Sequence, residues 1–223
     1  SLFVVGGVEN MSDYPLLYAR EYQDFLEALG RKRSLASRLA FFLKFRPRFL
    51  TPRIGVLEGL TDPVCGLIMG MTAEMISRDL RISREEQDAF ALDSHRKAEA
   101  ATKAGRFKDE IFSVPLPPKY DSFLDFDNGI REGQSMEALA KLKPFFDRRN
   151  GTVTVGSSSQ VTDGAAALLV GTDDAAKAAG RAPLGYLRAW AYAGNDPSRM
   201  GLGPAYATPL ALKKAGLAMK DIG

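Results

Sequence analysis

The alternation of hydrophobic and polar positions changes along the chain, and each pattern predicts a different kind of element. Residues 2–5 form a short apolar run that ends at a glycine pair, which predicts a strand. From residue 13 to about 146 the pattern is mainly helical, with proline-broken connections. Residues 152–155 are β-branched throughout, and residues 165–170 form an apolar run, so both predict strands; the composition of the second is typical of a covered central strand.

Two helices have recognisable start and stop signals. Ser83 and Glu86 have the S-x-x-E spacing of a capping box, which predicts a helix that begins there and stops at Gly105. Thr172 precedes two aspartates and predicts the start of a short alanine-rich helix that ends at Gly180.

The C-terminal part continues the alternation of strands and helices. Residues 184–193 predict another strand. Earlier in the chain, just before residues 152–155, the pair Asn150-Gly151 predicts a hairpin-type turn. Thr208 as cap and Pro209 at the first helical position predict a helix that is stopped by Gly216. This alternation favours an α/β fold with layered strands and helices.

Six segments, taken in order, resemble the sequence motifs of the thiolase family. They are residues 6–12 (GGVENMS), 69–74 (MGMTAE), 83–91 (SREEQDAFA, followed by Ser94-His95), 127–131 (DNGIR), 141–170 (the thiolase signature region) and 200–209 (MGLGPAYATP). One such motif would be a weak signal, but six in the right order and at suitable spacing are specific. The resemblance extends along nearly the whole chain.

The resemblance implies a partial thiolase fold. Thiolases have two similar βαβαβαββ halves that form a layered α-β-α-β-α core, and a loop domain inserted in the first half covers coenzyme A (CoA). By this resemblance, residues 1–12 supply a core strand of the first half and residues 13–147 form the mainly helical loop domain. Residues 148–180 would complete the first half, and residues 181–223 would begin the second.

The resemblance also defines the expected chemistry. Thiolases transfer an acyl group from 3-ketoacyl-CoA to CoA in fatty-acid β-oxidation, using a nucleophilic cysteine, a histidine and a second cysteine. This chain contains one cysteine, Cys65, and one histidine, His95. We therefore expect a fragment of a 3-ketoacyl-CoA thiolase that supplies CoA and acyl binding, has no catalytic residue or metal site, and is inactive alone. A degenerate thiolase that only binds acyl-CoA is the alternative.

Cys65 and His95 are an alternative candidate pair, a nucleophile and its base. Cys65 lies in an apolar loop before a helix, and His95 lies within a polar helix. No sequence feature brings them together, so a buried inert cysteine and an exposed helix histidine are the simpler interpretation.

Five residues occupy positions at which the family binds CoA or the acyl chain. Arg131 corresponds to an arginine near the nucleotide end of CoA, and Ser159 to a loop serine that binds the pantetheine arm. Met69, Phe146 and Met200 match apolar positions along that arm and the thioester pocket. The alternatives are a solvated arginine, a turn serine bonded to its own backbone, and ordinary core residues. CoA is expected as a substrate, and no cofactor is expected.

Three positions depart from the common family pattern. Ile68 stands where biosynthetic thiolases often carry histidine, Gln160 where glycine is common, and Ala138 where a serine often contacts CoA. Each departure removes or alters a polar contact. Together they argue against a short-chain biosynthetic role.

Composition excludes several other classes of protein. The 223 residues are 45% hydrophobic, enough for a sizeable core, and the net charge of +3 is too small to indicate a nucleic-acid partner. No apolar run approaches the roughly 20 residues that cross a bilayer, and no leader pattern is seen, so we expect a cytoplasmic location. Residues 2–5 begin as a strand with no lead-in, and by the resemblance residues 222–223 stop where the family enters its next core strand. Such ends would leave strand edges and apolar faces unpaired, so we expect a piece of a longer chain.

The positive charge is concentrated in one segment. Eight basic residues and no acidic residue lie between Arg31 and Arg53: Arg31, Lys32, Arg33, Arg38, Lys44, Arg46, Arg48 and Arg53. Leu35, Leu39 and Phe42 form one apolar helical stripe there. Such a helix can bind an anionic membrane surface, or its apolar face can pack on this protein or on a partner subunit.

This segment carries a finer resemblance. Residues 19–52 resemble the helical insertion of the long-chain thiolase branch, the β subunits of fatty-acid-oxidation trifunctional complexes. Members of that branch associate with a hydratase/dehydrogenase α subunit, and some lie on a membrane. The resemblance therefore implies these partners, together with a homo-oligomer, as thiolases are usually dimers or tetramers.

Overall fold

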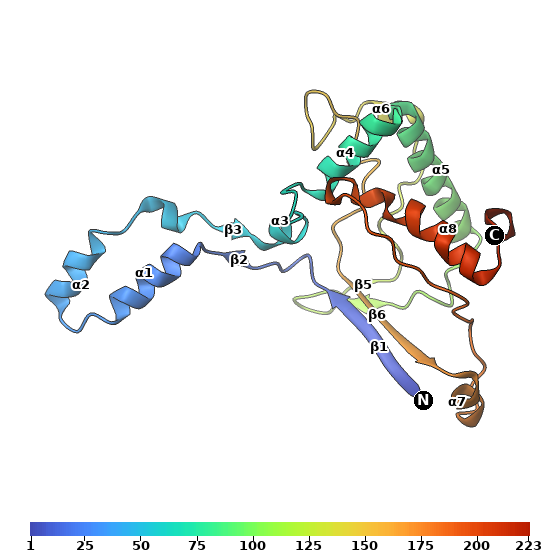
Figure 1. Cartoon of the computed structure of the whole chain (residues 1–223), viewed down its shortest axis with the longest axis horizontal. Helices are drawn as coiled ribbons and strands as arrows, with labels where there is room; N and C mark the ends of the chain where they lie inside the picture. Colours follow the sequence, from blue (N-terminus) through green and yellow to red (C-terminus); the bar gives the residue numbers. More distant parts are fainter. The chain divides into compact units, whose positions relative to one another are not determined.

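The computed structural model describes residues 1–223, and the chain divides into two compact units (Figure 1). Unit 1 comprises Ser1–Met69, Val161–Ala193 and Tyr206–Gly223. Unit 2 comprises Gly70–Gln160 and Gly194–Ala205.

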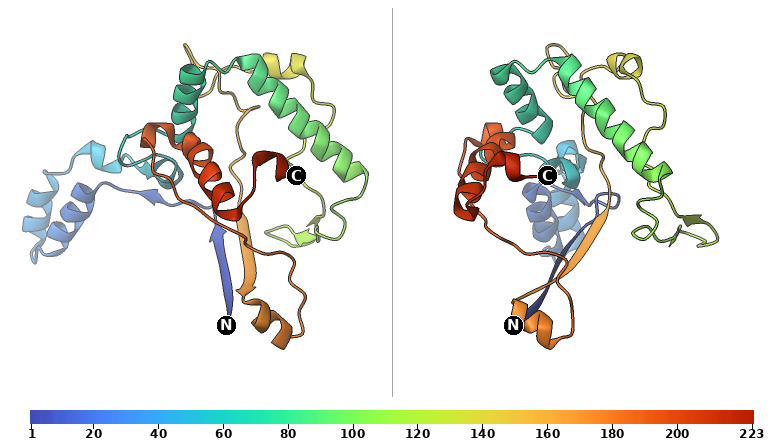
Figure 2. Two further views of the ribbon diagram at one scale, coloured as in Figure 1. Left: turned by 45° about the vertical axis from the view of Figure 1, so that its right-hand side comes forward. Right: turned by 90° about the vertical axis from the view of Figure 1, so that its right-hand side faces the viewer.

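Unit 1 contains an antiparallel ribbon of two strands that are far apart in the sequence. Strand β1 (Leu2–Glu9) pairs with β6 (Gly164–Gly171) over its whole length, and the two lie side by side in both figures that show the whole chain (Figures 1 and 2). Both predicted strands are confirmed, and β1 continues through the glycine pair. A Cβ atom at Gly6 would lie 2.5 Å from the backbone oxygen of Ala166, so the strands fit only with glycine there. Every residue of the ribbon is exposed, and the predicted covering of β6 is absent from the structure.

One carboxylate fastens the end of β1 to the start of β6. Asp163 accepts hydrogen bonds from the backbone N–H groups of Met11 and Ser12, both at 2.8 Å, and from the Ser12 hydroxyl at 2.6 Å. These bonds, chiefly that of the Ser12 hydroxyl, hold the pKa of Asp163 below its ordinary value.

A helical hairpin forms a second part of unit 1. Helix α1 (Arg20–Gly30) and helix α2 (Leu35–Phe42) are followed by a 3-10 turn (Pro47–Leu50). At its base, β2 (Leu16–Leu17) pairs with β3 (Arg53–Ile54). The segment therefore leaves and returns at one point, as expected of an insertion.

The hairpin has an aromatic core of its own. Its rings have centroids 5.3–6.5 Å apart and belong to Tyr22, Phe25, Phe41, Phe42, Phe45 and Phe49. Phe25 and Phe49 are the buried members. Edge-on and offset ring pairs of this kind add stability beyond the area they bury.

Unit 1 also contains several short elements, which include α3 (Gly55–Gly59), α7 (Asp173–Ala178) and a 3-10 turn (Met219–Asp221). The Thr172 hydroxyl caps α7 as predicted, by accepting a hydrogen bond from the backbone of Ala175.

Helix α8 (Gly203–Ala215) begins in unit 2 and ends in unit 1. The prediction that it begins at Thr208 with Pro209 in its first position was wrong, because Pro209 lies inside the helix. Gly216 follows it with φ +69°, as the stop signal predicted.

Unit 2 is built on three helices: α4 (Met69–Leu80), α5 (Arg84–Lys103) and α6 (Met136–Ala140), which packs on α5. Its small hydrophobic core consists of Ala91, Leu92 and Leu139, and Leu139 is fully buried. Unit 2 also contains the paired strands β4 (Val114–Pro115) and β5 (Phe123–Leu124), and a 3-10 segment (Pro197–Leu202).

The capping box at the start of α5 is confirmed. The Ser83 hydroxyl accepts the Glu86 backbone N–H at 3.2 Å, and the Glu86 carboxylate accepts the Ser83 backbone N–H at 2.7 Å. Gly105, with φ +69°, lies just after the helix. The bonds from Ser83 hold the pKa of Glu86 below its ordinary value.

Three local predictions were wrong. Residues 152–155 and 184–193 form no strand, although both have strand-like composition. The third wrong prediction is the hairpin-type turn at Asn150-Gly151. The Asp147 carboxylate accepts the backbone N–H groups of Arg149 and Asn150, and these bonds shape a local turn instead. Strand-like composition is only a weak guide, since a strand needs a partner.

The chain exposes a large surface for its mass. Its accessible surface is 17606 Å² for 24.3 kDa. A compact protein of this mass exposes about 10,000 Å², and two separate domains of half the mass would expose roughly 12,000 Å². Apolar strands such as β1 and β6 account for part of the excess.

Candidate functional site

Helix α4 organises unit 2 because one of its faces receives the segment that follows α6. Gly70, Glu74 and Ser77 lie at i, i+4 and i+7, so they share that face, and all three are buried. A Cβ atom at Gly70 would lie 2.2 Å from the ring of Phe146, which shows how closely the ring packs on the helix backbone. The Ser77 hydroxyl lies 3.0 Å from the Thr152 hydroxyl.

Glu74 is the central group of this face, with a side chain only 1% exposed. Its Oε1 accepts the backbone N–H of Val153 at 2.9 Å, and its two oxygens accept the N–H of Thr152 at 3.1 and 2.9 Å. A Cβ atom at Gly151 would lie 2.3 Å from Oε1, so glycine is needed for the backbone to approach. The carboxylate thus supplies the hydrogen-bond acceptors for the N–H groups of residues 152 and 153 that the carbonyl groups of a neighbouring strand would otherwise supply.

A second segment, the 3-10 segment Pro197–Leu202, docks on other residues of α4. Arg199 Nε donates to Asp79 Oδ2 at 2.6 Å, and this bond raises the pKa of the Arg199 guanidinium. A Cβ atom at Gly201 would lie 2.9 Å from the side chain of Ile76. Met200 lies between these two contacts and is 45% exposed, so its thioether remains available to a ligand.

Residues 154–160, here called the serine loop, continue from the segment that Glu74 holds. The Thr154 backbone oxygen accepts the hydroxyls of Ser157 at 3.3 Å and Ser158 at 2.7 Å. Thr154 is fully buried, and its own hydroxyl accepts the N–H of Gly156. Ser159, by contrast, is exposed, and its hydroxyl makes no hydrogen bond within the chain. The turn-type hydrogen bond to the backbone, which is the alternative role for Ser159, is therefore made by Ser157 and Ser158 and not by Ser159.

Residues 127–131, here called the arginine loop, attach to α5. The Asp127 carboxylate accepts the Gly129 N–H at 2.8 Å, which shapes the turn. The Arg131 N–H donates to His95 Nδ1 at 3.2 Å. The Arg131 side chain is exposed and has no ion pair or hydrogen bond within the chain. The loop thus presents a free guanidinium from an anchored backbone.

A single side chain joins the two loops. Gln160 Nε2 donates to the backbone oxygen of Gly129 at 3.1 Å. This bond ties the residue next to Ser159 to a residue two positions before Arg131. The structure therefore brings the serine loop and the arginine loop together.

The five predicted site residues fall into two groups. Phe146 and Met200 belong to segments that dock on α4, and Met69, which is 42% exposed, is its first residue. Ser159 and Arg131 belong to the two loops that Gln160 joins. Their roles toward a ligand stay predictions.

The residues that support this arrangement are not apparent from the sequence. Glu74 lies within the MGMTAE motif, but the motif does not show where its carboxylate points. Gln160 stands out in the sequence only as a departure from the family pattern, and no sequence feature marks the contact of Asp79 with Arg199. Their partners lie between 31 and 120 residues away, so no local pattern reveals them.

Cys65 and His95 do not have the surroundings of a catalytic pair. The Asp62 carboxylate accepts the Cys65 N–H at 2.9 Å and forms a tight turn. His95 uses Nδ1 to hold the arginine loop. Each residue therefore has a local structural role.

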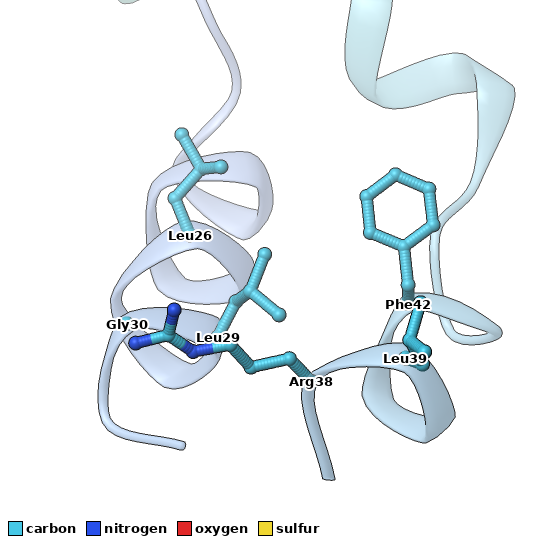
Figure 3. Close-up of a pocket in the computed structure, with 6 residues that line it drawn as sticks. All are labelled: Leu26, Leu29, Gly30, Arg38, Leu39 and Phe42. Carbon is cyan, nitrogen blue, oxygen red and sulfur yellow. The ribbon is translucent and has the colours of Figure 1, made fainter. Parts of the chain in front are cut away.

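An open pocket of about 370 Å³ lies between α1 and α2 (Figure 3). It is lined by Leu26, Leu29, Gly30, Arg38, Leu39 and Phe42. Figure 3 shows the Arg38 side chain reaching across from α2 toward Gly30 at the end of α1, and its Nε donates to the backbone oxygen of Lys32 at 2.9 Å. None of the helices in the structure has the length and apolar character needed to span a membrane.

Comparisons with known proteins identify the family of the chain. The family model described as Thiolase, N-terminal domain matches residues 1–174, and that described as Thiolase, C-terminal domain matches residues 181–223. The chain belongs to the thiolase family.

Among curated relatives, the chain is similar to the 3-ketoacyl-CoA thiolases of Pseudoalteromonas translucida (41% identical) and Shewanella halifaxensis (39% identical), in both cases over 220 residues. Each match covers 98% of this chain and 50% of the relative. The chain thus spans about half the length of the curated relatives it matches.

Solved structures give the same result. Human mitochondrial 3-ketoacyl-CoA thiolase in complex with CoA has a TM-score of 0.76 at 34% identity, over 99% of this chain and 50% of that one. The Bacillus anthracis acetyl-CoA acetyltransferase has a TM-score of 0.76 at 32% identity, and the match covers 99% of this chain and 51% of that one. The predicted partial thiolase fold of the α/β class is confirmed. The loop-domain boundaries and the trifunctional-complex branch stay predictions.

Proposed function

We propose that this chain forms the CoA-binding part of a 3-ketoacyl-CoA thiolase, which transfers an acyl group from 3-ketoacyl-CoA to CoA. The names of its relatives and the CoA complex of the human neighbour support this. In the proposal, Arg131 binds a CoA phosphate, Ser159 binds the pantetheine arm, and Met69, Phe146 and Met200 line the path of the arm and the acyl chain.

One observation carries this proposal: the bond from Gln160 that joins the arginine loop to the serine loop. The joined loops carry a free guanidinium and a free hydroxyl. A guanidinium suits a phosphate because its fixed fork of donors matches the phosphate oxygens, and a hydroxyl suits an amide. CoA has phosphates and amides on one flexible arm, so it can use both groups.

Calorimetric titration of CoA into the 223-residue chain tests the proposal. Replacing Arg131 by glutamine removes a charge-assisted bond, so we expect about tenfold weaker binding or more. Arg106→Gln is the matched control, because Arg106 is also exposed in unit 2 and its side chain has no partner. Equal affinities of the two variants, or an unmodified chain that does not bind CoA, would contradict the proposal.

We also propose that the chain does not catalyse thiolysis by itself. Its one cysteine and one histidine are used in a turn and a loop anchor, and a thiolase requires two cysteines and a histidine. Mixing the pure chain with 3-ketoacyl-CoA and CoA tests this. Release of acetyl-CoA would refute it, whereas CoA binding without turnover also fits a degenerate acyl-CoA-binding thiolase.

A second candidate function is binding of an anionic membrane surface by the α1–α2 hairpin. Of the eight basic residues from Arg31 to Arg53, three have an acidic partner: Arg31 with Glu27, Arg48 with Glu21, and Arg53 with Glu58. Leu35, Leu39 and Leu43, on or just after α2, are well exposed. Cations without an acidic partner, beside exposed leucines, suit the boundary between lipid headgroups and acyl chains.

Co-sedimentation with phosphatidylserine-containing vesicles tests this second function. The double variant Arg33→Glu, Arg46→Glu reverses two free charges and should lose vesicle binding, while the matched pair Arg148→Glu, Arg149→Glu in unit 2 should retain it. Equal binding by both variants would refute the proposal. If the chain fails to bind vesicles but binds a hydratase/dehydrogenase α subunit, the hairpin is assigned to that partner. Measurement of the molecular size in solution would separately detect a homo-oligomer.

A further inference from the structure

Gln160 and Gly129 fit each other closely. A Cβ atom on Gly129 would lie 2.7 Å from Gln160 Nε2, so the amide rests on a bare α-carbon. From that position Nε2 donates to the Gly129 backbone oxygen at 3.1 Å. Gly129 does not have a positive φ, so its lack of a side chain matters here for space and not for backbone conformation.

Each loop has its own anchor apart from this contact. The arginine loop is held by Asp127 and His95, and the serine loop by Thr154 and the Glu74 face of α4. The Gln160 bond is the one hydrogen bond that joins them. The distance between the phosphate-binding and amide-binding groups therefore depends on this side chain.

We propose that Gln160 is a positioning residue that fixes the spacing of Arg131 and Ser159, so that one CoA molecule can contact both. The inference rests on the proposed function. It adds a residue that acts by holding the two loops and not by contacting either end of the ligand. Holding two loops in the bound arrangement reduces the ordering cost of binding. The benefit goes only to a ligand long enough to reach both loops.

Ligand length therefore provides the first test. A single neutral hydrogen bond contributes about 1 kcal/mol, so Gln160→Gly should weaken binding of CoA about fivefold. Pantetheine, which lacks the nucleotide and its phosphates, should bind Gln160→Gly and the unmodified chain equally. A general structural defect would weaken both ligands, and that result would overturn the proposal.

A double-mutant cycle provides the second test. Gly129→Ala alone should weaken CoA binding by a similar factor, because its methyl group displaces the Gln160 amide. With Gln160→Gly already present, the methyl group no longer meets the amide, so Gly129→Ala should add little. Additive losses would show that the two positions act independently and would overturn the inference.

The tests separate this inference from the proposed function. If the unmodified chain binds no CoA, the proposed function fails and this inference fails with it. If the unmodified chain binds CoA and Arg131→Gln weakens binding, but Gln160→Gly has no effect, only the positioning role is refuted.

Discussion

Replacing Glu74 by glutamine should destabilise unit 2, because the carboxylate accepts two backbone donors in a buried place. A glutamine oxygen at the Oε1 position keeps the bonds from Val153 and Thr152, at 2.9 and 3.1 Å. The glutamine NH₂ group then faces the Thr152 N–H, where the carboxylate has an acceptor at 2.9 Å. The change therefore removes one charge-assisted bond and places two donors against each other.

The expected cost follows from these contacts. A hydrogen bond to a charged group contributes about 1.5–3 kcal/mol, and the easier burial of a neutral amide offsets part of its loss. We expect the free energy of unfolding to fall by about 2 kcal/mol for Glu74→Gln. For Glu74→Ala, which leaves both N–H groups without an acceptor and opens a cavity, we expect about 4 kcal/mol.

Urea denaturation at neutral pH measures this effect as a shift of the midpoint at constant slope. Glu110→Gln is the matched control, because Glu110 is exposed and its side chain has no partner, so its variant should stay within about 0.5 kcal/mol of the unmodified chain. If Glu74→Gln and Glu110→Gln unfold at the same urea concentration, the assignment of Glu74 as the backbone acceptor is refuted.

Three further predictions concern stability. Gly70→Ala should lower the free energy of unfolding by about 1–3 kcal/mol, because the methyl group meets the ring of Phe146, and urea denaturation measures it. Asp163→Asn should destabilise the chain at pH 7 and by a smaller amount at pH 3: the folded-state pKa of Asp163 is lowered, so its contribution is fully present above its ordinary pKa of 3.8 and is lost progressively as the pH falls toward the lowered pKa. Thermal unfolding at the two pH values measures the difference from the unmodified chain. Ser158→Ala should lower stability by about 1 kcal/mol because it removes the bond to the Thr154 backbone oxygen.

Each of these predictions has a matched control. Gly203→Ala introduces a methyl group that meets nothing within 4 Å, and Asp125→Asn changes an exposed aspartate whose side chain has no partner. Ser159→Ala removes a hydroxyl without a bond, so it should leave stability unchanged while weakening CoA binding. A control that is destabilised as much as its test variant would contradict the corresponding contact. For Asp163→Asn, a stability difference as large at pH 3 as at pH 7 would also contradict it.

The sequence predicted elements whose signals are local. The Ser83–Glu86 capping box and the cap at Thr172 lie within a few residues of the helices they start, and both were confirmed. The strand predicted at residues 152–155 failed because the backbone N–H groups of Thr152 and Val153 bind Glu74, 78 and 79 residues away, and that of Thr154 binds Ser157. A β-branched composition cannot distinguish a neighbouring strand from a buried carboxylate as the acceptor.

The same limit applies to the candidate site. Motif order was enough to indicate the family and to nominate Arg131 and Ser159, because the motifs are contiguous. The residue that joins them was not recognised, since Gln160 acts through a glycine 31 positions earlier. Sequence therefore nominated candidate ligand-binding groups, and the structure was needed to find the groups that hold them.

The β1–β6 ribbon has a practical consequence for anyone who produces this chain. Its two strands expose apolar side chains such as Phe3, Val4, Leu168 and Leu169, and each strand has one edge without a hydrogen-bonded neighbour. Long apolar edges of this kind recruit strands from other molecules. Preparations should therefore become turbid as concentration rises, and mild detergent or a charged solubility tag should delay this. Binding assays on the chain are best run dilute and checked by light scattering.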